Sequence, residues 1–270
     1  MLMAGQKIMI NFIKYIEIGR ELLCSLLFPK RCLVCDEILE PEEVEKGIHT
    51  ACENKLYPVI GAVCMHCGRP FGKEIQNYKQ NEYECALEYC FDCIKKGYHR
   101  KSNIIQAKAL YLYKGKIKTS MYRFKYSNKR EYGEFFAKEV SKRYESWIKQ
   151  LGVEVLVPVP MYERKQKRRG YNQAVCFAKQ ISKYIGIPVD TNLVQRVVDT
   201  APQKGLNENE RKNNLKNAFQ MSESVVQYSC AMVVDDIYTT GSTAEAVAQE
   251  LIKRGTRRVY LMTICIGEDM

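Results

Sequence analysis

The chain has 270 residues, room for about two domains, and its hydrophobic content of 46% is ordinary for a globular protein. Its 42 Lys and Arg against 31 Asp and Glu give a formal net charge of +11, which favours polyanions: nucleic acid, an acidic membrane surface or phosphate-rich small molecules. It contains no run of about 18 apolar residues and no evident secretory signal, so we expect neither a membrane-spanning segment nor secretion.

The first predicted element is an amphipathic helix within residues 1–30. Ile, Phe and Leu recur at helical spacing from Ile8 to Phe28, with charged residues between them. Such a helix in a basic chain can lie on a membrane surface. Packing against the chain's own domain is the alternative, and we favour it.

A cysteine-rich segment, residues 31–100, comes next. The chain has 12 Cys, and those of this segment begin at Cys32 and end at Cys93. Thiols stay reduced in a cytosolic chain, so clustered Cys pairs there indicate a bound metal rather than disulfides. A bound metal would replace a hydrophobic core in this segment.

Four ligand pairs in this segment have two residues between their members, the spacing of zinc knuckles. The four pairs supply eight ligands, enough for one or two tetrahedral zinc sites. Tetrahedral sites with no open position are structural rather than catalytic. Pairing neighbours gives two sites of four ligands each, and a cross-braced arrangement stays open. His66, inside the third pair, is not expected to bind, and Cys85 is spare. The predicted ligands are Cys32, Cys35, His49, Cys52, Cys64, Cys67, Cys90 and Cys93.

Residues 101–270 alternate strand and helix patterns, which predicts an α/β domain with a parallel sheet. Strands are expected at 107–113, 153–159, 230–234 and 258–266. Helices are expected at 116–147, as one or two segments, at 171–185 and at 242–254. Lys125 and Tyr126 would close the first of these helices.

The most informative segment is 230–243, where an apolar strand ends in two acids and leads through a turn into a helix. Ligands of open parallel sheets bind beyond the carboxyl ends of strands. There, Asp235 and Asp236 can accept hydrogen bonds from a vicinal diol or from metal-bound water. The turn offers backbone N–H groups, hydroxyls and the positive end of a helix to a phosphate. Its residues are Thr239, Thr240, Gly241, Ser242 and Thr243.

A run of cations follows the strand at 153–159. Such a run is usually a solvated surface. Here it lies on the same rim as the two acids, and arginine forks match phosphate oxygens in pairs, so it is a candidate contact for pyrophosphate or DNA. The polar stretch 196–219 is a candidate lid or binding loop. The cations are Arg164, Lys165, Lys167, Arg168 and Arg169.

The acid pair and its turn resemble the phosphoribosyl pyrophosphate (PRPP) signature of phosphoribosyltransferases. In chain order, the motifs together resemble the ComF/GntX family of competence-associated proteins over nearly the whole chain. One departure is His49, where a Cys is common in the family; this changes the ligand type and little else. The resemblance rests on the Cys pairs and on Phe124-Lys125-Tyr126, Val157-Pro158-Val159-Pro160, Arg168-Arg169-Gly170-Tyr171-Asn172-Gln173 and the Asp-Asp-x-x-Thr-Thr-Gly turn.

The resemblance implies a phosphoribosyltransferase-type domain at 101–270 that binds PRPP with Mg²⁺. It also implies single-stranded DNA binding during DNA uptake in natural transformation. The chain would act in the cytoplasm, at the inner face of the membrane, beside a helicase-like partner.

Two functions from different classes stay open. The first is a binding protein that grips single-stranded DNA through the cation run and the zinc module, with Tyr126, Tyr171 and Tyr238 as stacking candidates. The second is an active phosphoribosyltransferase on an unidentified base or nucleotide. Its catalytic acids, Asp235 and Asp236, would hold ribose hydroxyls and Mg²⁺, the turn the 5′-phosphate, and the arginines the pyrophosphate. The intact turn disfavours a third reading, a zinc-stapled scaffold with a vestigial pocket.

Overall fold

The computed structural model describes residues 27–71, 88–199, 215, 218–222 and 226–267. The chain divides into two compact units, Met1–Asn54 and Lys55–Met270. Most of the predicted amphipathic helix, residues 1–26, lies outside the described residues, as does Cys85. None of the helices in the described ranges combines the length and apolar character that a membrane crossing requires.

The described part of the first unit is a small knuckle with one short helix, α2 (Thr50–Glu53). A tight turn closes where Arg31 and Ile38 form an antiparallel bridge. Asp36 takes a positive φ of 68° in this turn, and its N–H donates to the carbonyl of Cys32 at 2.9 Å. Few apolar residues are buried here, among them Leu33 and Ile48, so the knuckle has little hydrophobic core of its own.

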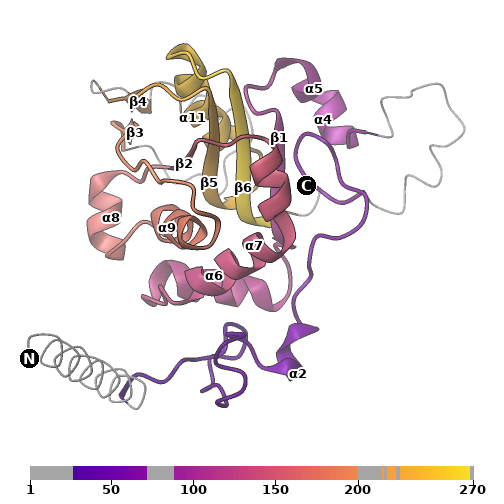
Figure 1. Ribbon diagram of the computed structural model, residues 1–270, viewed down its shortest axis with the longest axis vertical. Coiled ribbons are helices and arrows are strands. Elements are labelled where there is room, and N and C mark those ends of the chain that lie inside the picture. Colours follow the sequence, from indigo (N-terminus) through magenta and orange to yellow (C-terminus); the bar gives the residue numbers. More distant parts are fainter. Residues whose placement is uncertain (1–26, 72–87, 200–214, 216–217, 223–225, 268–270) are drawn as a thin grey trace, which may run out of the picture. The chain divides into compact units, whose positions relative to one another are not determined.

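The second unit is built on a parallel sheet in the order β1-β6-β5-β2 (Figure 1). Every residue of β6 after Arg258 is buried, as expected of a central strand covered on both faces. The predicted α/β class with a parallel sheet is confirmed. The strands are β1 (Gln106–Leu112), β2 (Val155–Pro158), β5 (Cys230–Tyr238) and β6 (Arg258–Ile266).

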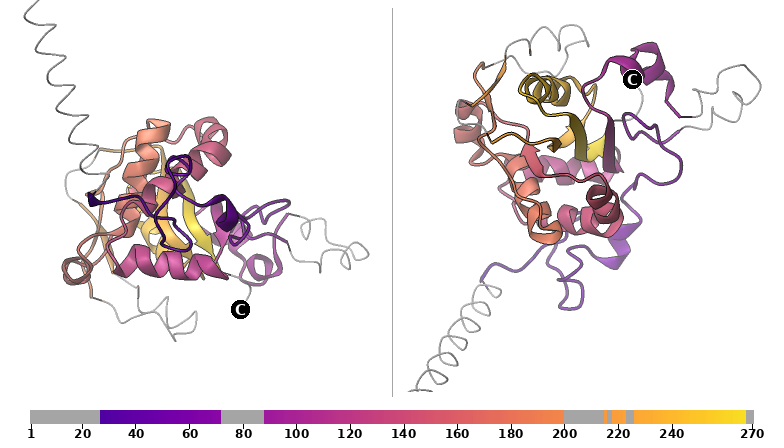
Figure 2. Two further views of the ribbon diagram at one scale, coloured as in Figure 1. Left: turned by 90° about the horizontal axis from the view of Figure 1, so that it is seen from below. Right: turned by 45° about the horizontal axis from the view of Figure 1, so that its top comes forward.

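Helices cover both faces of this sheet (Figures 1 and 2). On one face, α9 packs against β2 and β5 and against α7, which contacts β1. On the other, α11 packs against β5, β6 and the antiparallel pair of β3 (Val194–Arg196) and β4 (Phe219–Met221). The region 116–147 forms two helices, not one. The helices are α6 (Lys116–Tyr126), α7 (Tyr132–Gln150), α9 (Gln173–Ile185) and α11 (Ser242–Lys253).

The chain leaves β2 and β5 in opposite directions. A parallel bridge between Leu156 and Val189 extends the sheet beyond β2, so the connection through α9 runs toward this edge of the sheet. The connection through α11 runs the other way, from β5 to β6. Right-handed crossovers place two such helices on opposite faces. The carboxyl ends of β2 and β5 therefore flank a topological switch point, where ligands of open α/β sheets bind. The short helix α8 (Glu163–Arg169) begins close after β2.

The second group of Cys pairs belongs to the larger unit. It includes the short helices α4 (Phe91–Lys95) and α5 (Tyr98–Lys101). The N–H of Ala107, in β1, donates to the carbonyl of His66 at 2.6 Å. Gly68 lies so close to β1 that a Cβ there would clash with the Ala107 carbonyl oxygen. The boundary between the two compact units, after Asn54, thus falls inside the segment 31–100, whose folding as one module stays a prediction.

Candidate functional site

β5 carries the two predicted acids near its carboxyl end and sends them to opposite sides, because successive strand residues alternate between the faces of a sheet. Asp235 lines a hollow of about 260 Å³ that it shares with Thr239–Thr243. Asp236 meets α6 instead, where the Nζ of Lys125 lies 2.9 Å from its Oδ2. The structure therefore brings Asp235 together with the hydroxyl-rich turn, while Asp236 forms an ion pair.

The turn from Thr239 to Thr243 has the features of an anion site. Gly241 precedes α11 with a φ of 78°, a conformation that side chains disfavour. The hydroxyls of Thr240 and Ser242 are buried and lie 2.9 Å apart. The N–H groups of the first turn of α11 add partial positive charge. All five residues predicted to bind phosphate line the one hollow.

The pKa of Asp235 is shifted. Burial and the neighbouring Asp236 carboxylate raise the pKa of Asp235 to about 7, against the opposing effects of Lys125 and Arg196. Burial acts to lower the pKa of Lys125, but its attraction to Asp236 outweighs this and the pKa is raised. Lys125 and Asp236 therefore form a charged pair, while Asp235 exchanges its proton near neutral pH. The sequence predicted Lys125 at the end of a helix, but not its pairing with Asp236.

Arg196 is a site residue that the sequence assigned only to a candidate lid. It lies on β3, and its guanidinium stacks 5.4 Å from the centroid of the Phe219 ring on β4. Burial lowers the pKa of Arg196, and the carboxylates of Asp199 and Asp235 act in the opposite direction. Strands of three residues carry too little pattern to predict this pairing. Residues 200–214, most of the candidate lid, lie outside the described ranges.

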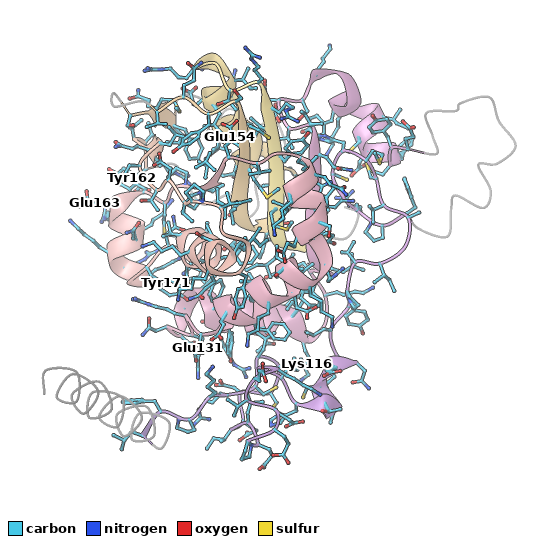
Figure 3. All side chains as sticks on the ribbon, in the orientation of Figure 1. Lys116, Glu131, Glu154, Tyr162, Glu163 and Tyr171 are labelled. Atoms are coloured by element: carbon cyan, nitrogen blue, oxygen red, sulfur yellow. The ribbon has the colours of Figure 1, made fainter. Side chains whose placement is uncertain are left out.

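The five cations predicted to contact pyrophosphate or DNA form helix α8 and point to different sides of it. Tyr162 and Glu163 mark its start in Figure 3. Lys167 pairs with Glu163 at 2.6 Å, and Lys165 with Asp199 at 3.2 Å. Arg169 donates to the hydroxyl of Tyr126 at 3.0 Å and stacks on that ring. Arg164 and Arg168 are exposed, so α8 presents these two most directly to an anion.

Side chains of the Gly-Tyr-Asn-Gln stretch after α8 join neighbouring elements through hydrogen bonds. Tyr171 is buried, and its hydroxyl donates to the Phe124 carbonyl of α6. Asn172 caps α9: its Oδ1 accepts from the N–H of Ala174 at 2.9 Å, and its Nδ2 donates to the carbonyl of Val159 at 2.9 Å. Tyr171 cannot stack on a base as predicted, because its ring belongs to the core.

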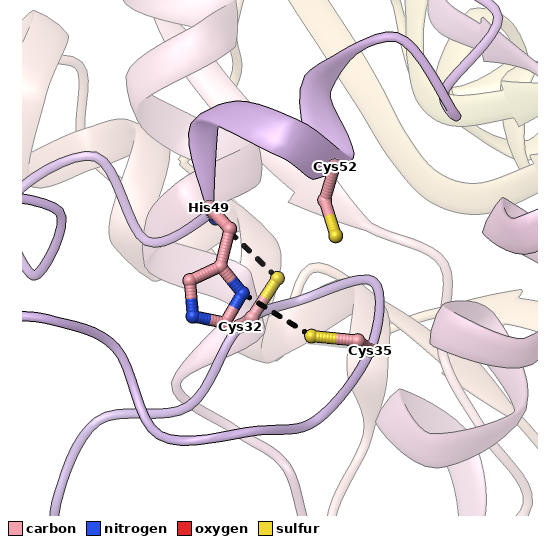
Figure 4. A group of neighbouring side chains, drawn as sticks. All are labelled: Cys32, Cys35, His49 and Cys52. Atoms are coloured by element: carbon pink, nitrogen blue, oxygen red, sulfur yellow. Dashed lines mark hydrogen bonds between the residues drawn. The ribbon is translucent and has the colours of Figure 1, made fainter.

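The first group of zinc ligands is Cys32, Cys35, His49 and Cys52 (Figure 4). Their ligand atoms lie within 4.8 Å of one another, and His49 Nδ1 lies 3.2 Å from Cys35 Sγ. His49 Nε2 lies 3.0 Å from the carbonyl oxygen of Ile38. A carbonyl can only accept, so Nε2 bears the proton and Nδ1 directs its lone pair at the sulfurs. This donor set fits a tetrahedral zinc ion.

The second group is Cys64, Cys67, Cys90 and Cys93. Sulfurs on a tetrahedral zinc ion, with bonds of about 2.3 Å, are about 3.8 Å apart. The Sγ atoms of Cys67 and Cys90 are 3.7 Å apart. His66 lies outside this group and packs on Tyr98, with ring centroids 5.4 Å apart. Neighbouring pairs combine in each group, so the cross-braced alternative does not apply.

Known proteins resemble this chain in its zinc-binding segment and over most of its length. Residues 23–94 match the model of a double zinc ribbon domain, which confirms the zinc-binding interpretation. Competence protein F of Haemophilus influenzae is 31% identical over 87% of this chain and 96% of its own. Competence protein ComFC of Bacillus subtilis is 24% identical over 83% of this chain and 89% of its own.

Two further matches cover a smaller part of this chain. DNA utilization protein YhgH of Escherichia coli is 38% identical over 110 residues, 41% of this chain and 48% of its own. A solved purine phosphoribosyltransferase of Pyrococcus horikoshii aligns with 50% of this chain and 84% of its own, at 13% identity and a TM-score of 0.33.

Proposed function

We propose a function on the basis of family membership: this chain belongs to the ComF family of competence proteins. In our proposal it serves DNA uptake, binding PRPP or a related phosphoribosyl compound and also single-stranded DNA. The names of its relatives, competence protein F and DNA utilization protein, support the role in DNA handling.

One observation carries the phosphoribosyl part. Asp235 and the turn Thr239–Thr243 line the same hollow at the carboxyl end of β5. A 5′-phosphate suits the buried hydroxyls and N–H groups of the turn. A ribose diol suits the carboxylate of Asp235, which accepts two hydrogen bonds once it is ionised.

Asp236 has a supporting role in this proposal. Its ion pair with Lys125 compensates one of the two negative charges at the strand end. Mg²⁺, when bound with PRPP, would neutralise pyrophosphate charge, and Asp235 is the carboxylate on the hollow's side that would hold its water ligands. Arg164 and Arg168 are the exposed cations of α8 that would meet the pyrophosphate.

Calorimetry tests this proposal. We expect PRPP to bind with Mg²⁺ and Asp235→Asn to weaken binding by about 10- to 100-fold, because hydrogen bonds to a charged group are lost. The matched control is Glu250→Gln, which removes a carboxylate paired with Lys253 on α11. Zinc content and circular dichroism should be unchanged in both variants. Unchanged PRPP affinity in Asp235→Asn would contradict the assignment of the site.

A surface on α6 supports the DNA part. Tyr122 and Tyr126 lie one helical turn apart, 62% and 53% exposed, with ring centroids 5.0 Å apart. The guanidinium of Arg169 stacks 4.8 Å from the Tyr126 centroid. The helix has no acidic residue and carries Lys116, Lys118, Arg123 and Lys125. Exposed aromatic rings among cations are typical of surfaces on which single-stranded bases stack.

We call Tyr122, Tyr126 and Arg169 the tyrosine platform. Of the three tyrosines that the sequence suggested for stacking, Tyr126 alone belongs to it. Tyr171 and Tyr238 are each 7% exposed and cannot take a base. Tyr122 was missed, although its spacing of four residues from Tyr126 places both on one helix face.

A further inference from the structure

A second hollow, of about 220 Å³, lies between the second zinc group and the phosphate-binding turn. Cys67 and Cys93 line it from the zinc side, and Thr239 and Thr240 from the turn. All of these residues belong to the larger compact unit. The two sites are therefore direct neighbours within one folded body.

Tyr238 is the side chain that joins them. It lines both hollows and is 7% exposed. A Cβ added to Gly241 would lie only 2.6 Å from the Tyr238 hydroxyl oxygen, which shows how closely the phenol supports the turn.

The zinc group is fixed to β1, and the segment that follows it is fixed to α11. The Nη1 of Arg69 lies 2.9 Å from Asp92, which joins the knuckle after Cys67 to the one before Cys93. The strand β1 bonds the backbone of His66. On α11, the carboxylate of Glu245 accepts from the hydroxyl of Ser102 at 2.7 Å and from the N–H of Asn103 at 2.8 Å. The turn has the zinc group on one side and this anchored helix on the other.

We propose that the second zinc centre, two of whose cysteines line the hollow beside the turn, positions the phosphate-binding turn through Tyr238; no ligand of the first centre lines either hollow. Tyr238 is a positioning residue here, since it acts on the ligand through the turn. The inference rests on the proposed phosphoribosyl function for its ligand, but its structural part can be measured without one. Without zinc, Cys67 and Cys93 lose their fixed arrangement, and the wall against which Tyr238 packs is lost.

A pair of matched variants tests the asymmetry. Cys90→Ser and Cys35→Ser each remove one half-buried ligand, from the second and the first group respectively. We expect Cys90→Ser to speed hydrogen exchange of the amides at 238–245 and to weaken PRPP binding by about tenfold or more, as loss of hydrogen bonds to a phosphate would. Cys35→Ser should leave both unchanged. Equal effects of the two variants, or none, would overturn the proposal.

A second pair keeps the zinc in place, in case Cys90→Ser fails to fold. Tyr238→Leu should retain the metal, speed exchange at 239–243 and weaken PRPP binding, whereas Tyr238→Phe, which keeps the ring, should restore most of both. Wild-type exchange and affinity in Tyr238→Leu would refute the link. If wild-type protein did not bind PRPP at all, the proposed function would fail, and the exchange data alone would decide the present inference.

Discussion

At the scale of single residues, Asp235 and Asp236 are neighbours in sequence but have different environments. The alternation of a strand gives one carboxylate to the turn and the other to Lys125. The charged groups near Asp235 are Asp236, Lys125 and Arg196. The effect of burial on the pKa of Asp235 outweighs the effect of the two cations, so the negative charge of Asp235 is unfavourable above neutral pH. Hydrogen bonds from the hydroxyls of a ligand would stabilise this charge.

This predicts a pH-dependent stability difference. A carboxyl whose pKa is raised on folding to about 7 stabilises the fold below its unfolded pKa, and this contribution is lost as pH rises through the folded pKa. Asp235→Asn should therefore melt increasingly above wild type as pH rises from about 4 to about 7, and by a constant margin above that, at about 2–4 °C for each kcal/mol removed. Differential scanning calorimetry across this window checks it. A difference in melting temperature that stays constant across the whole window would contradict it.

Gly241 gives a second prediction at this scale. Ala at this position meets both the strain of a φ of 78° and the hydroxyl of Tyr238. Gly186→Ala is the control, because Gly186 has a φ of 82° but a Cβ there meets nothing within 4 Å. We expect about 1 kcal/mol of destabilisation in the control and a larger loss, with abolished PRPP binding, in Gly241→Ala. Urea unfolding with calorimetry measures both; equal losses and intact binding would count against it.

At the scale of elements, the sequence predicted what lies contiguous in the chain. The strand, turn and helix from Cys230 to Lys253 follow one another directly, so their pattern was readable. The pairing of Asp236 with Lys125 and the proximity of Arg196 to Asp235 join distant segments, and no local pattern encodes them. The sequence predicted the cation run as a cluster of charge but not as a helix. In a helix the side chains point to several sides, so the cations do not form one surface.

The tyrosine platform predicts an effect of α6 on DNA binding. Replacing Tyr122 and Tyr126 by Ala should weaken binding of labelled oligo(dT), measured by fluorescence anisotropy, by about 1–3 kcal/mol per stacked base. Tyr184→Ala is the matched control, because Tyr184 is also exposed, at 38%, but lies on α9. Binding should also fall steeply with salt. If Tyr184→Ala weakened binding as much as the double variant, the platform would not be the contact.

At the scale of the whole molecule, the two compact units depend on zinc to different degrees. The described knuckle of the first unit buries few apolar residues, so we expect metal binding to supply most of its folding free energy. The second unit has a sheet whose central strands β5 and β6 lie between helices and are largely buried. The Cys spacing predicted the ligands of both centres, but not the attachment of the second centre to the sheet, which arises from backbone contacts such as Ala107 to His66.

Removal of zinc should therefore affect the units unequally. We expect a strong chelator to bring amide exchange in residues 31–54 to the rate of an unfolded chain, while β5 and β6 stay protected. Hydrogen exchange with mass spectrometry resolves the two regions. Loss of protection in β5 and β6 at the same chelator concentration would show that the sheet also requires the metal.

The contact between Tyr238 and Gly241 has a consequence for metal retention. Coupling between two binding sites is reciprocal: any free energy by which zinc favours the sugar phosphate is returned by the sugar phosphate to zinc. With PRPP bound, a competing chelator should extract less metal from the second centre at equilibrium, and the same amount from the first. Bound PRPP would then raise the zinc affinity of one of the two centres, so the zinc occupancy of that centre would follow the concentration of PRPP.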